Sequence, residues 1–232
     1  MKIVISGYGK MGKEIEKAIS TMPNIELVQA TEDISSIDEK VASDSVCIDF
    51  TTPSAFRSNY KVIADKFKAV VVGTTGWYDI KDEIIGYFIK KGTPMIYASN
   101  FSIGVNIFFK LSEISSKLLS SFDMYQPYII EKHHIHKLDA PSGTAKTIGH
   151  IVENNFKKPV DIQSVRCGEI SGIHTLGYES VVDRITMEHE AFSRAGFARG
   201  AIQAALWTSN MKGVHEFRDL LEDQFKKLID NE

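Results

Sequence analysis

Short runs of apolar, largely β-branched residues recur through the first hundred positions, and most are followed by a stretch with helical spacing. The runs that predict strands are residues 2–6, 26–30, 46–50, 69–73 and 95–98. The clearest helical stretches are residues 11–22, 54–67 and 79–91. Strands that are apolar on both faces and alternate with helices predict a Rossmann-type α/β fold with a doubly wound parallel sheet.

The rhythm changes after residue 100. A long helical pattern at 103–119 precedes a strand at 125–131, a polar loop and a helix at about 142–154. Three β-rich runs then follow one another, at 161–167, 173–182 and 183–191. Consecutive strands without long helices between them favour an antiparallel or mixed sheet, so we predict a second, α+β domain. Residues 196–211 and the charged tail 214–229 have helical spacing.

Composition narrows the class of protein. Of 232 residues, 43% are hydrophobic and 25% are charged, which is typical of a globular chain. The net charge of −3 provides no basic field for nucleic acid or for an anionic membrane. Cys47 and Cys167 cannot form a disulfide framework, and no apolar run approaches the length of a membrane span. An apolar strand that begins at residue 2 leaves no room for a signal peptide, so we expect a cytoplasmic protein.

A GxGxxG motif separates the first strand from the first helix; it consists of Gly7, Tyr8, Gly9, Lys10, Met11 and Gly12. In a dinucleotide site the first glycine permits a tight turn, the second lets the pyrophosphate approach the backbone, and the third lets helix and strand pack closely. The alternative is a glycine-rich turn that binds nothing. The strand–helix steps that follow favour the dinucleotide site.

An acidic residue is expected about 20 residues further on, at the end of the second strand. Glu32 lies there, and Asp33 follows it. A carboxylate at this point accepts hydrogen bonds from the ribose hydroxyls of NAD and repels the extra phosphate of NADP, so we expect NADH to be favoured over NADPH. Lys10 could reach that phosphate and would soften the preference. The alternative is that both acids only cap the next helix.

Small polar residues follow three later strands, in residues 49–51, 73–76 and 98–102. Ligands of open α/β sheets bind at the carboxyl ends of the strands, and hydroxyl and amide groups there suit a nicotinamide ribose and carboxamide. Each segment alone is an ordinary turn. Their coincidence favours a cofactor site.

Three of the seven histidines, His133, His134 and His136, fall within four residues and are followed by Lys137. Neighbouring side chains on a strand point in opposite directions, so we do not expect these histidines to converge on a metal ion. Imidazole beside a lysine suits general acid–base chemistry and an anionic substrate. The remaining alternative is solvated histidines in a loop.

The segment from Asp139 to Thr144 has the capping residues and early proline of a helix start. The backbone N–H groups of Ser142, Gly143 and Thr144 would form an anion site for a carboxylate or phosphate. An ordinary capped helix is the alternative.

The pattern E-x-H-H-x-x-K-x-D-x-P-S-G-T-A, which begins at Glu131, resembles the dihydrodipicolinate reductases. Further segments match that family in its own order, so that the resemblance extends from residue 3 to about residue 207. These segments are residues 7–12, 49–51, 73–76, 100–106, 172–175 and 193–194.

This resemblance implies a nicotinamide-dependent reductase of lysine and diaminopimelate biosynthesis. Its substrate would be the cyclic unsaturated imine, a dicarboxylate made from pyruvate and aspartate semialdehyde, and its product tetrahydrodipicolinate. The resemblance assigns acid–base catalysis to His133 and proton donation to Lys137. It assigns the substrate carboxylates to His134, Gly143 and Thr144.

The family also implies a cofactor domain of residues 1–103, completed by the C-terminal helices in 195–232. Residues 104–194 would bind substrate and form a homotetramer. We expect NADH or NADPH as cofactor and no metal. The expected cofactor-binding residues are Gly7, Tyr8, Gly9, Lys10, Met11, Gly12, Glu32, Gly73, Thr74, Thr75, Ala98, Ser99, Asn100 and Phe101.

Two other functions compete with this one. A different two-domain Rossmann dehydrogenase, acting on an amino or sugar acid, would not predict the His-His-x-x-Lys run followed by Ser-Gly-Thr. A dinucleotide-sensing protein without catalysis would not need His133, Lys137 and the anion-binding turn.

Overall fold

The computed structural model describes residues 1–229 and divides into two compact units. The first comprises Met1–Ser102 and the chain from Arg194 onward, and the second comprises Ile103–Ser193. Each boundary lies one residue from the expected one.

The first unit is built on six parallel strands in the order β10-β5-β4-β3-β1-β2. Their bounds are β1 Lys2–Ser6, β2 Glu26–Thr31, β3 Ser45–Asp49, β4 Ala69–Val72, β5 Met95–Tyr97 and β10 Val214–Glu216. The chain moves outward from β1 to β2 and then returns to the other side of β1 for β3. This reversal places the switch point of a doubly wound sheet next to β1, and the predicted fold class of this unit is confirmed.

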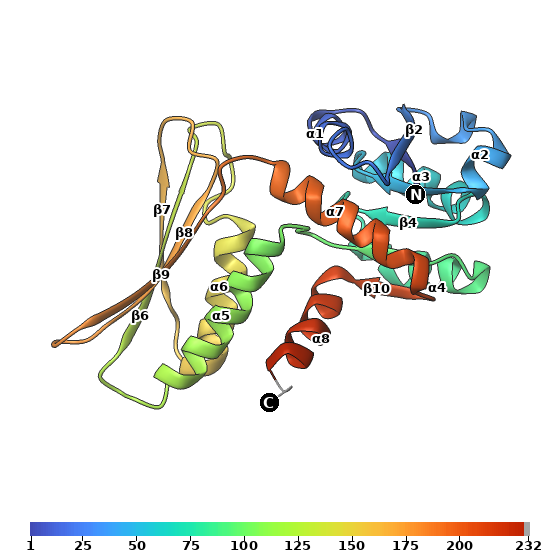
Figure 1. Ribbon diagram of the computed structural model, residues 1–232. Coiled ribbons are helices and arrows are strands. Elements are labelled where there is room, and N and C mark those ends of the chain that lie inside the picture. The colour runs from blue at the N-terminus through green and yellow to red at the C-terminus, as the bar shows by residue number, and fades with distance from the viewer. Residues whose placement is uncertain (230–232) are drawn as a thin grey trace. The chain divides into compact units, whose positions relative to one another are not determined.

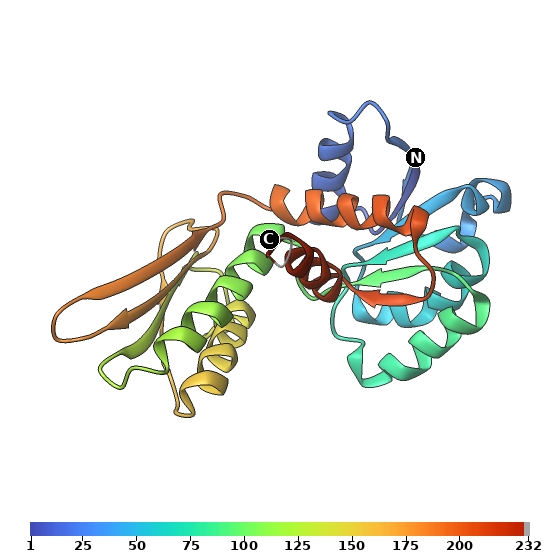
Figure 2. The same ribbon diagram turned by 60° about the horizontal axis from the view of Figure 1, so that its bottom comes forward.

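Helices cover both faces of this sheet (Figures 1 and 2). On one face α1 packs against α7, and on the other α3 lies beside α4. The helices are α1 Lys10–Ile19, α2 Glu39–Ser43, α3 Pro53–Lys66, α4 Lys81–Lys91, α7 Ala195–Trp207 and α8 Phe217–Ile229. Local sequence explains the start of α3, because the Thr52 hydroxyl accepts from Ala55 N and Pro53 occupies the first turn.

The second unit is a four-stranded mixed sheet in the order β7-β6-β8-β9. Its strands are β6 Gln126–His133, β7 Asp161–Arg166, β8 Ile173–Glu179 and β9 Arg184–Glu190. Strands β6 and β7 are parallel because α6 (Gly143–Phe156) connects them, whereas β8 and β9 follow as antiparallel neighbours. Helix α5 (Ile103–Leu119) lies beside α6 along one face of the sheet (Figure 1). The predicted mixed sheet is confirmed.

Some elements differ from the prediction. Residues 214–216 form strand β10 rather than the start of a helix, because Gly213 turns the chain at a φ of +80° and Val214–Glu216 then pairs with Met95–Tyr97. Strand β6 also continues through His133, so that this histidine belongs to the sheet and not to the polar loop. The short helix α2 was not predicted.

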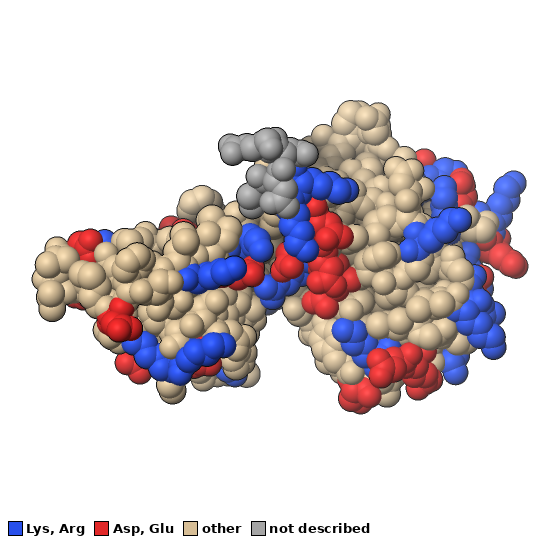
Figure 3. All heavy atoms as spheres, turned by 90° about the horizontal axis from the view of Figure 1, so that it is seen from below, with Lys and Arg blue, Asp and Glu red and all other residues tan. Residues whose placement is uncertain are grey.

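Charged side chains of both signs are interspersed on the face drawn in Figure 3, in agreement with the near-balanced composition. Among residues 1–229, no helix combines the length and the apolar character that crossing a membrane requires.

Candidate active site

The three motif glycines have different surroundings. Gly7 has a φ of +89°, and a Cβ on it would lie 2.6 Å from the carbonyl oxygen of Phe50. A Cβ on Gly12 would collide with the carbonyl oxygen of Gly7. A Cβ on Gly9, by contrast, would meet no atom within 4 Å. Gly7 and Gly12 are therefore required by the fold, whereas Gly9 keeps open space in front of the N-terminus of α1, where a pyrophosphate is expected.

The two acidic residues after β2 have separate tasks. A carboxylate oxygen of Glu32 accepts from the backbone N–H of Tyr8 at 2.7 Å, which ties the end of β2 to the glycine loop. Asp33 accepts from Ser35 N at 3.0 Å and caps a 3₁₀ turn, and hydrogen bonds from Ser35 lower the pKa of Asp33. The capping alternative thus holds for Asp33 and not for Glu32.

Hydrogen bonds join the ends of β3 and β4. The hydroxyl of Thr74 donates to buried Asp49 at 2.6 Å and accepts from Thr51 N at 2.7 Å. Burial raises the pKa of Asp49. At the end of β5, the side chain of Asn100 accepts from Ser102 N at 2.8 Å, and Phe101 is buried. The predicted cofactor residues therefore lie at the carboxyl ends of β1, β2, β4 and β5.

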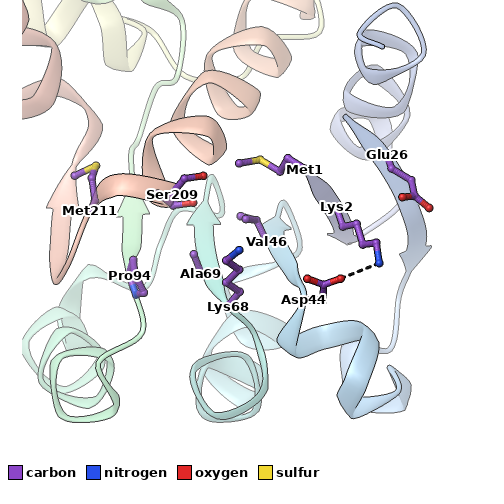
Figure 4. A pocket seen from close by; sticks show the side chains of 11 residues that line it. Met1, Lys2, Glu26, Asp44, Val46, Lys68, Ala69, Pro94, Ser209 and Met211 are labelled. Carbon is purple, nitrogen blue, oxygen red and sulfur yellow. Dashed lines mark hydrogen bonds and ion pairs between the residues drawn. The ribbon is translucent and has the colours of Figure 1, made fainter. Parts of the chain in front are cut away.

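A separate pocket of about 510 Å³ lies at the opposite, amino-terminal ends of the strands (Figure 4). Met1, Val46 and Ala69 contribute to its lining, as do Lys2 and Asp44, which form an ion pair. Because ligands of open α/β sheets bind at the carboxyl ends, this pocket is not the candidate cofactor site.

In the second unit, three polar side chains are buried together: Glu131, His133 and His174 are 0%, 7% and 5% exposed. Glu131 and His133 lie on β6, and His174 lies on β8, where it is paired with Glu131 in the antiparallel register. The rings of His133 and His174 meet edge to face, with centroids 5.1 Å apart. One oxygen of Glu131 contacts Nδ1 of His133, and the other accepts from the Arg166 guanidinium at 2.7 Å.

Burial and neighbouring charges set the protonation of this cluster. Burial alone would raise the pKa of Glu131, but the interactions with Arg166, Ser164 and His133 outweigh it and lower the pKa below its ordinary value. The pKa of His133 is lowered mainly by burial, although Glu131 opposes that shift. Burial also lowers the pKa of His174, to about 4. The cluster at neutral pH is thus a carboxylate that faces a guanidinium and two neutral imidazoles.

Nε2 is the accessible nitrogen of His133. Its Nδ1 faces Glu131, whereas a Cβ on Gly172 would lie 3.1 Å from Nε2. A glycine at position 172 therefore leaves Nε2 uncovered. The alternative of solvated histidines is wrong for His133 and holds for His136, which is exposed.

Lys137 and the start of α6 belong to the same cluster. The Lys137 ammonium pairs with Asp139 at 2.7 Å. Ser142 caps α6 by accepting from Ala145 N, and its hydroxyl lies 3.1 Å from Nε2 of His174. A Cβ on Gly143 would meet no atom within 4 Å, so the first turn of α6 is open to a ligand. His134 is half-buried one residue beyond the end of β6.

One group of side chains in the described residues has metal-ligand geometry. Ligand atoms of Glu131, His133 and His174 lie within 4.8 Å of one another. The group takes only His133 from the run of neighbouring histidines, whereas its other histidine, His174, comes from β8 and is not revealed by the local spacing. The carboxylate also faces the Arg166 guanidinium and contacts Nδ1 of His133 directly.

Sequence reasoning assigned no role to Arg166, Gly172 or His174. The available signal was the matching segment 172–175, which contains two of these residues. Their place next to His133 depends on strand register, which residue spacing does not give.

Two features indicate the class of protein. The first unit is a Rossmann-type unit with a glycine loop and an acidic residue after its second strand, and the second unit brings together histidine, lysine and a helix N-terminus. These features are typical of two-domain oxidoreductases that depend on nicotinamide dinucleotides.

The family models described as "Dihydrodipicolinate reductase, N-terminus" and "Dihydrodipicolinate reductase, C-terminus" match residues 1–101 and 104–221. The chain belongs to the dihydrodipicolinate reductase family.

Two curated relatives extend the match over nearly the whole chain. The 4-hydroxy-tetrahydrodipicolinate reductase of Christiangramia forsetii is 36% identical over 97% of this chain and 100% of its own. That of Methanococcoides burtonii is 33% identical over 94% of this chain and 97% of its own.

Among solved structures, a dipicolinate-bound dihydrodipicolinate reductase from Paenisporosarcina sp. TG-14 has a TM-score of 0.77 at 21% identity, covering 93% of this chain and 97% of its own. This likeness concerns the fold.

Proposed function

We propose that the chain is a 4-hydroxy-tetrahydrodipicolinate reductase, which uses NADH or NADPH to reduce the cyclic unsaturated imine to tetrahydrodipicolinate. The observation that carries the proposal is the cluster in which His133, Lys137 and the N-terminus of α6 are linked through Glu131, His174 and Asp139. Family membership supports it independently.

The first unit fits a dinucleotide. The open space at Gly9 and the N-terminus of α1 suit the pyrophosphate, and Glu32 suits the adenosine ribose. Residues 73–75 and 98–101 would line the nicotinamide end. When bound, the reduced nicotinamide would supply a hydride to the conjugated ring carbon of the substrate.

The second unit would hold the substrate carboxylates. The N–H groups of Gly143 and Thr144 belong to the first turn of α6, where helix N–H groups lack partners within the helix. His134 would provide a further polar contact. A flanking carboxylate placed there would orient the ring toward Lys137 and His133.

The proton would come from the His133–Lys137 pair. With its Nδ1 against a carboxylate, His133 can exchange a proton with a ligand only through Nε2. Lys137 would donate its proton to the substrate, while its positive charge also stabilises the anion that forms as hydride adds. The ion pair with Asp139 holds the lysine ammonium in place.

The direct experiment is an assay of purified protein with NADH and the freshly made condensation product of pyruvate and aspartate semialdehyde. NADH consumption that requires this product supports the proposal. NADH consumption with other oxo or imino acids would favour the second dehydrogenase function, and NADH binding without turnover would favour a sensor.

We further propose that the enzyme is a metal-free, cytoplasmic homotetramer. Chelators such as EDTA are expected to leave the turnover number unchanged, because imidazole and ammonium groups suffice to activate an imine flanked by carboxylates. Stoichiometric bound zinc whose removal abolishes activity would contradict this, and Glu131, His133 and His174 would then be its ligands. Sedimentation analysis would test the tetramer.

A further inference from the structure

Arg166 reaches two different parts of the candidate proton-transfer site. It is the last residue of β7 and pairs with His133 of β6 in the parallel register. Its Nη2 donates to Glu131 at 2.7 Å and to the backbone carbonyl of Asp139 at 2.6 Å, and its side chain is only 18% exposed. The guanidinium therefore bridges strand β6 and the loop that leads to α6.

Each end of this bridge touches the partner of a candidate catalytic group. Glu131 contacts Nδ1 of His133, and the carboxylate of Asp139 pairs with the ammonium of Lys137 at 2.7 Å. Moving the guanidinium would disturb both partners at once. Within the described residues, the Arg166 guanidinium donates to Glu131 and to the carbonyl groups of Asp139 and Val165, so that it acts on His133 and Lys137 through their partners.

We propose that Arg166 is a positioning residue that holds His133 and Lys137 in one arrangement, acting through Glu131 and Asp139. This inference rests on the proposed function for the roles of those two residues. Arginine suits the task because its planar fork directs several N–H groups at fixed angles, whereas lysine carries a single compact ammonium on a shorter reach.

The charged and titratable groups around His133 determine in which direction its pKa should change when Arg166 is replaced. They are Glu131 on its own strand, Arg166 on β7, His174 on β8 and Lys137 in the following loop. Arg166 lowers the pKa of His133 by direct repulsion and also pairs with the carboxylate that would raise it. Removal of the guanidinium is therefore expected to raise the pKa of His133, and removal of the Glu131 charge to lower it.

The first measurement is the titration of His133 by NMR, with its signal assigned from its loss in His133→Asn. We expect Arg166→Met to move the midpoint upward and Glu131→Gln to move it downward. Arg184→Met is the matched control, since Arg184 lies on β9 of the same sheet, pairs with Glu179 and is 55% exposed. A midpoint that stays or falls in Arg166→Met would overturn the proposal.

The second measurement separates charge from geometry. Arg166→Lys keeps the positive charge and is expected to keep the titration midpoint, but to lower kcat on the order of 10- to 100-fold, because the shorter lysine side chain does not reach the position of Nη2, from which both hydrogen bonds are donated. The KM for NADH is expected to stay unchanged, since the cofactor binds the first unit. Wild-type kcat in Arg166→Lys would overturn the bridging role, and this variant also keeps the test valid where Arg166→Met does not fold.

The titration requires no substrate and thus separates this inference from the proposed function. If the wild-type protein fails to reduce the imine but the midpoints still move as expected, the proposed function alone is lost. If the reductase is active and the midpoints do not move, the positioning role alone is lost.

Discussion

The carboxyl edge of the first sheet and the polar cluster of the second unit are formed by different kinds of groups. At the first sheet, backbone groups and small residues matter: Gly9 leaves open space, and Glu32 ties the loop to β2. In the second unit, a carboxylate and two imidazoles are buried next to one another, and Arg166 donates a hydrogen bond to the carboxylate. The first site is formed mainly by the shape of the backbone, so its charged groups can stay in contact with solvent. The second site consists of buried charged and polar groups, and its stability therefore depends on the partners of each group.

This difference predicts that the two regions fail separately, and the largest expected effect lies in the second unit. His133→Ala and Lys137→Ala are each expected to lower kcat about 10²- to 10⁴-fold, the usual contribution of general acid–base catalysis. NADH binding, followed by nucleotide fluorescence, is expected to remain at the wild-type level. Near wild-type turnover in both variants would show that the acid–base assignment is wrong.

Buried titratable groups also predict that acid affects the stability of the two units in opposite directions. Burial lowers the pKa of His174 to about 4, against about 6.5 in an unfolded chain. Between these values the unfolded state binds more protons, so the free energy of unfolding decreases as the pH falls from 6.5 toward 4, by about 3 kcal/mol at most. In the first unit Asp49 has a raised pKa, and its contribution is instead present at low pH and lost as the pH rises.

Urea denaturation at pH 7, 5.5 and 4.5 tests this contrast. Circular dichroism follows both units, whereas tryptophan fluorescence follows Trp77 and Trp207, which both belong to the first unit. His174→Gln is expected to flatten the acid slope seen by circular dichroism. His150→Gln, which changes a histidine with a 78% exposed side chain, is the control. An unchanged slope in His174→Gln would show that burial does not hold this imidazole neutral.

Substitutions of two glycines in the first unit are expected to separate an effect on cofactor binding from an effect on stability. Gly9→Ala is expected to keep the wild-type melting temperature and to weaken NADH binding about tenfold, since its Cβ meets no atom of the chain but enters the space expected for the pyrophosphate. Gly12→Ala is expected to lower the melting temperature, because its Cβ collides with Gly7. Equal NADH affinity in Gly9→Ala and wild type would place the pyrophosphate elsewhere.

The same division explains what the sequence could predict. Strand and helix periods, helix caps and glycine motifs are local, so the order of the longer elements and the α5 bounds follow from spacing alone. Strand β10 was missed because three residues carry no period and their partner, β5, lies more than a hundred residues earlier. The places of Arg166 and His174 depend on the β6–β7 and β6–β8 registers, which hydrogen bonds between distant segments determine.

The smallest expected effect concerns the preference between NADH and NADPH at the exposed carboxyl edge of the first sheet. Glu32 stands at the end of β2, where ribose hydroxyls are expected, and one of its oxygens is already engaged by Tyr8 N. Asp33 adds negative charge nearby, although its carboxylate is turned to Ser35. Lys10, exposed at the start of α1, would attract a 2′-phosphate. Because all these groups are in contact with solvent, their effects are screened and only a mild preference for NADH is expected.

The ratio of kcat/KM for NADH to that for NADPH, measured at low salt, tests this balance. We expect a value of at least one in the wild type, and we expect Glu32→Ala to shift it toward NADPH by less than about tenfold, or 1.4 kcal/mol. Lys10→Ala is the matched variant and should shift the ratio toward NADH. A wild-type preference for NADPH of tenfold or more would mean that one exposed lysine outweighs two carboxylates, and that this edge recognises charge more strongly than its exposure suggests.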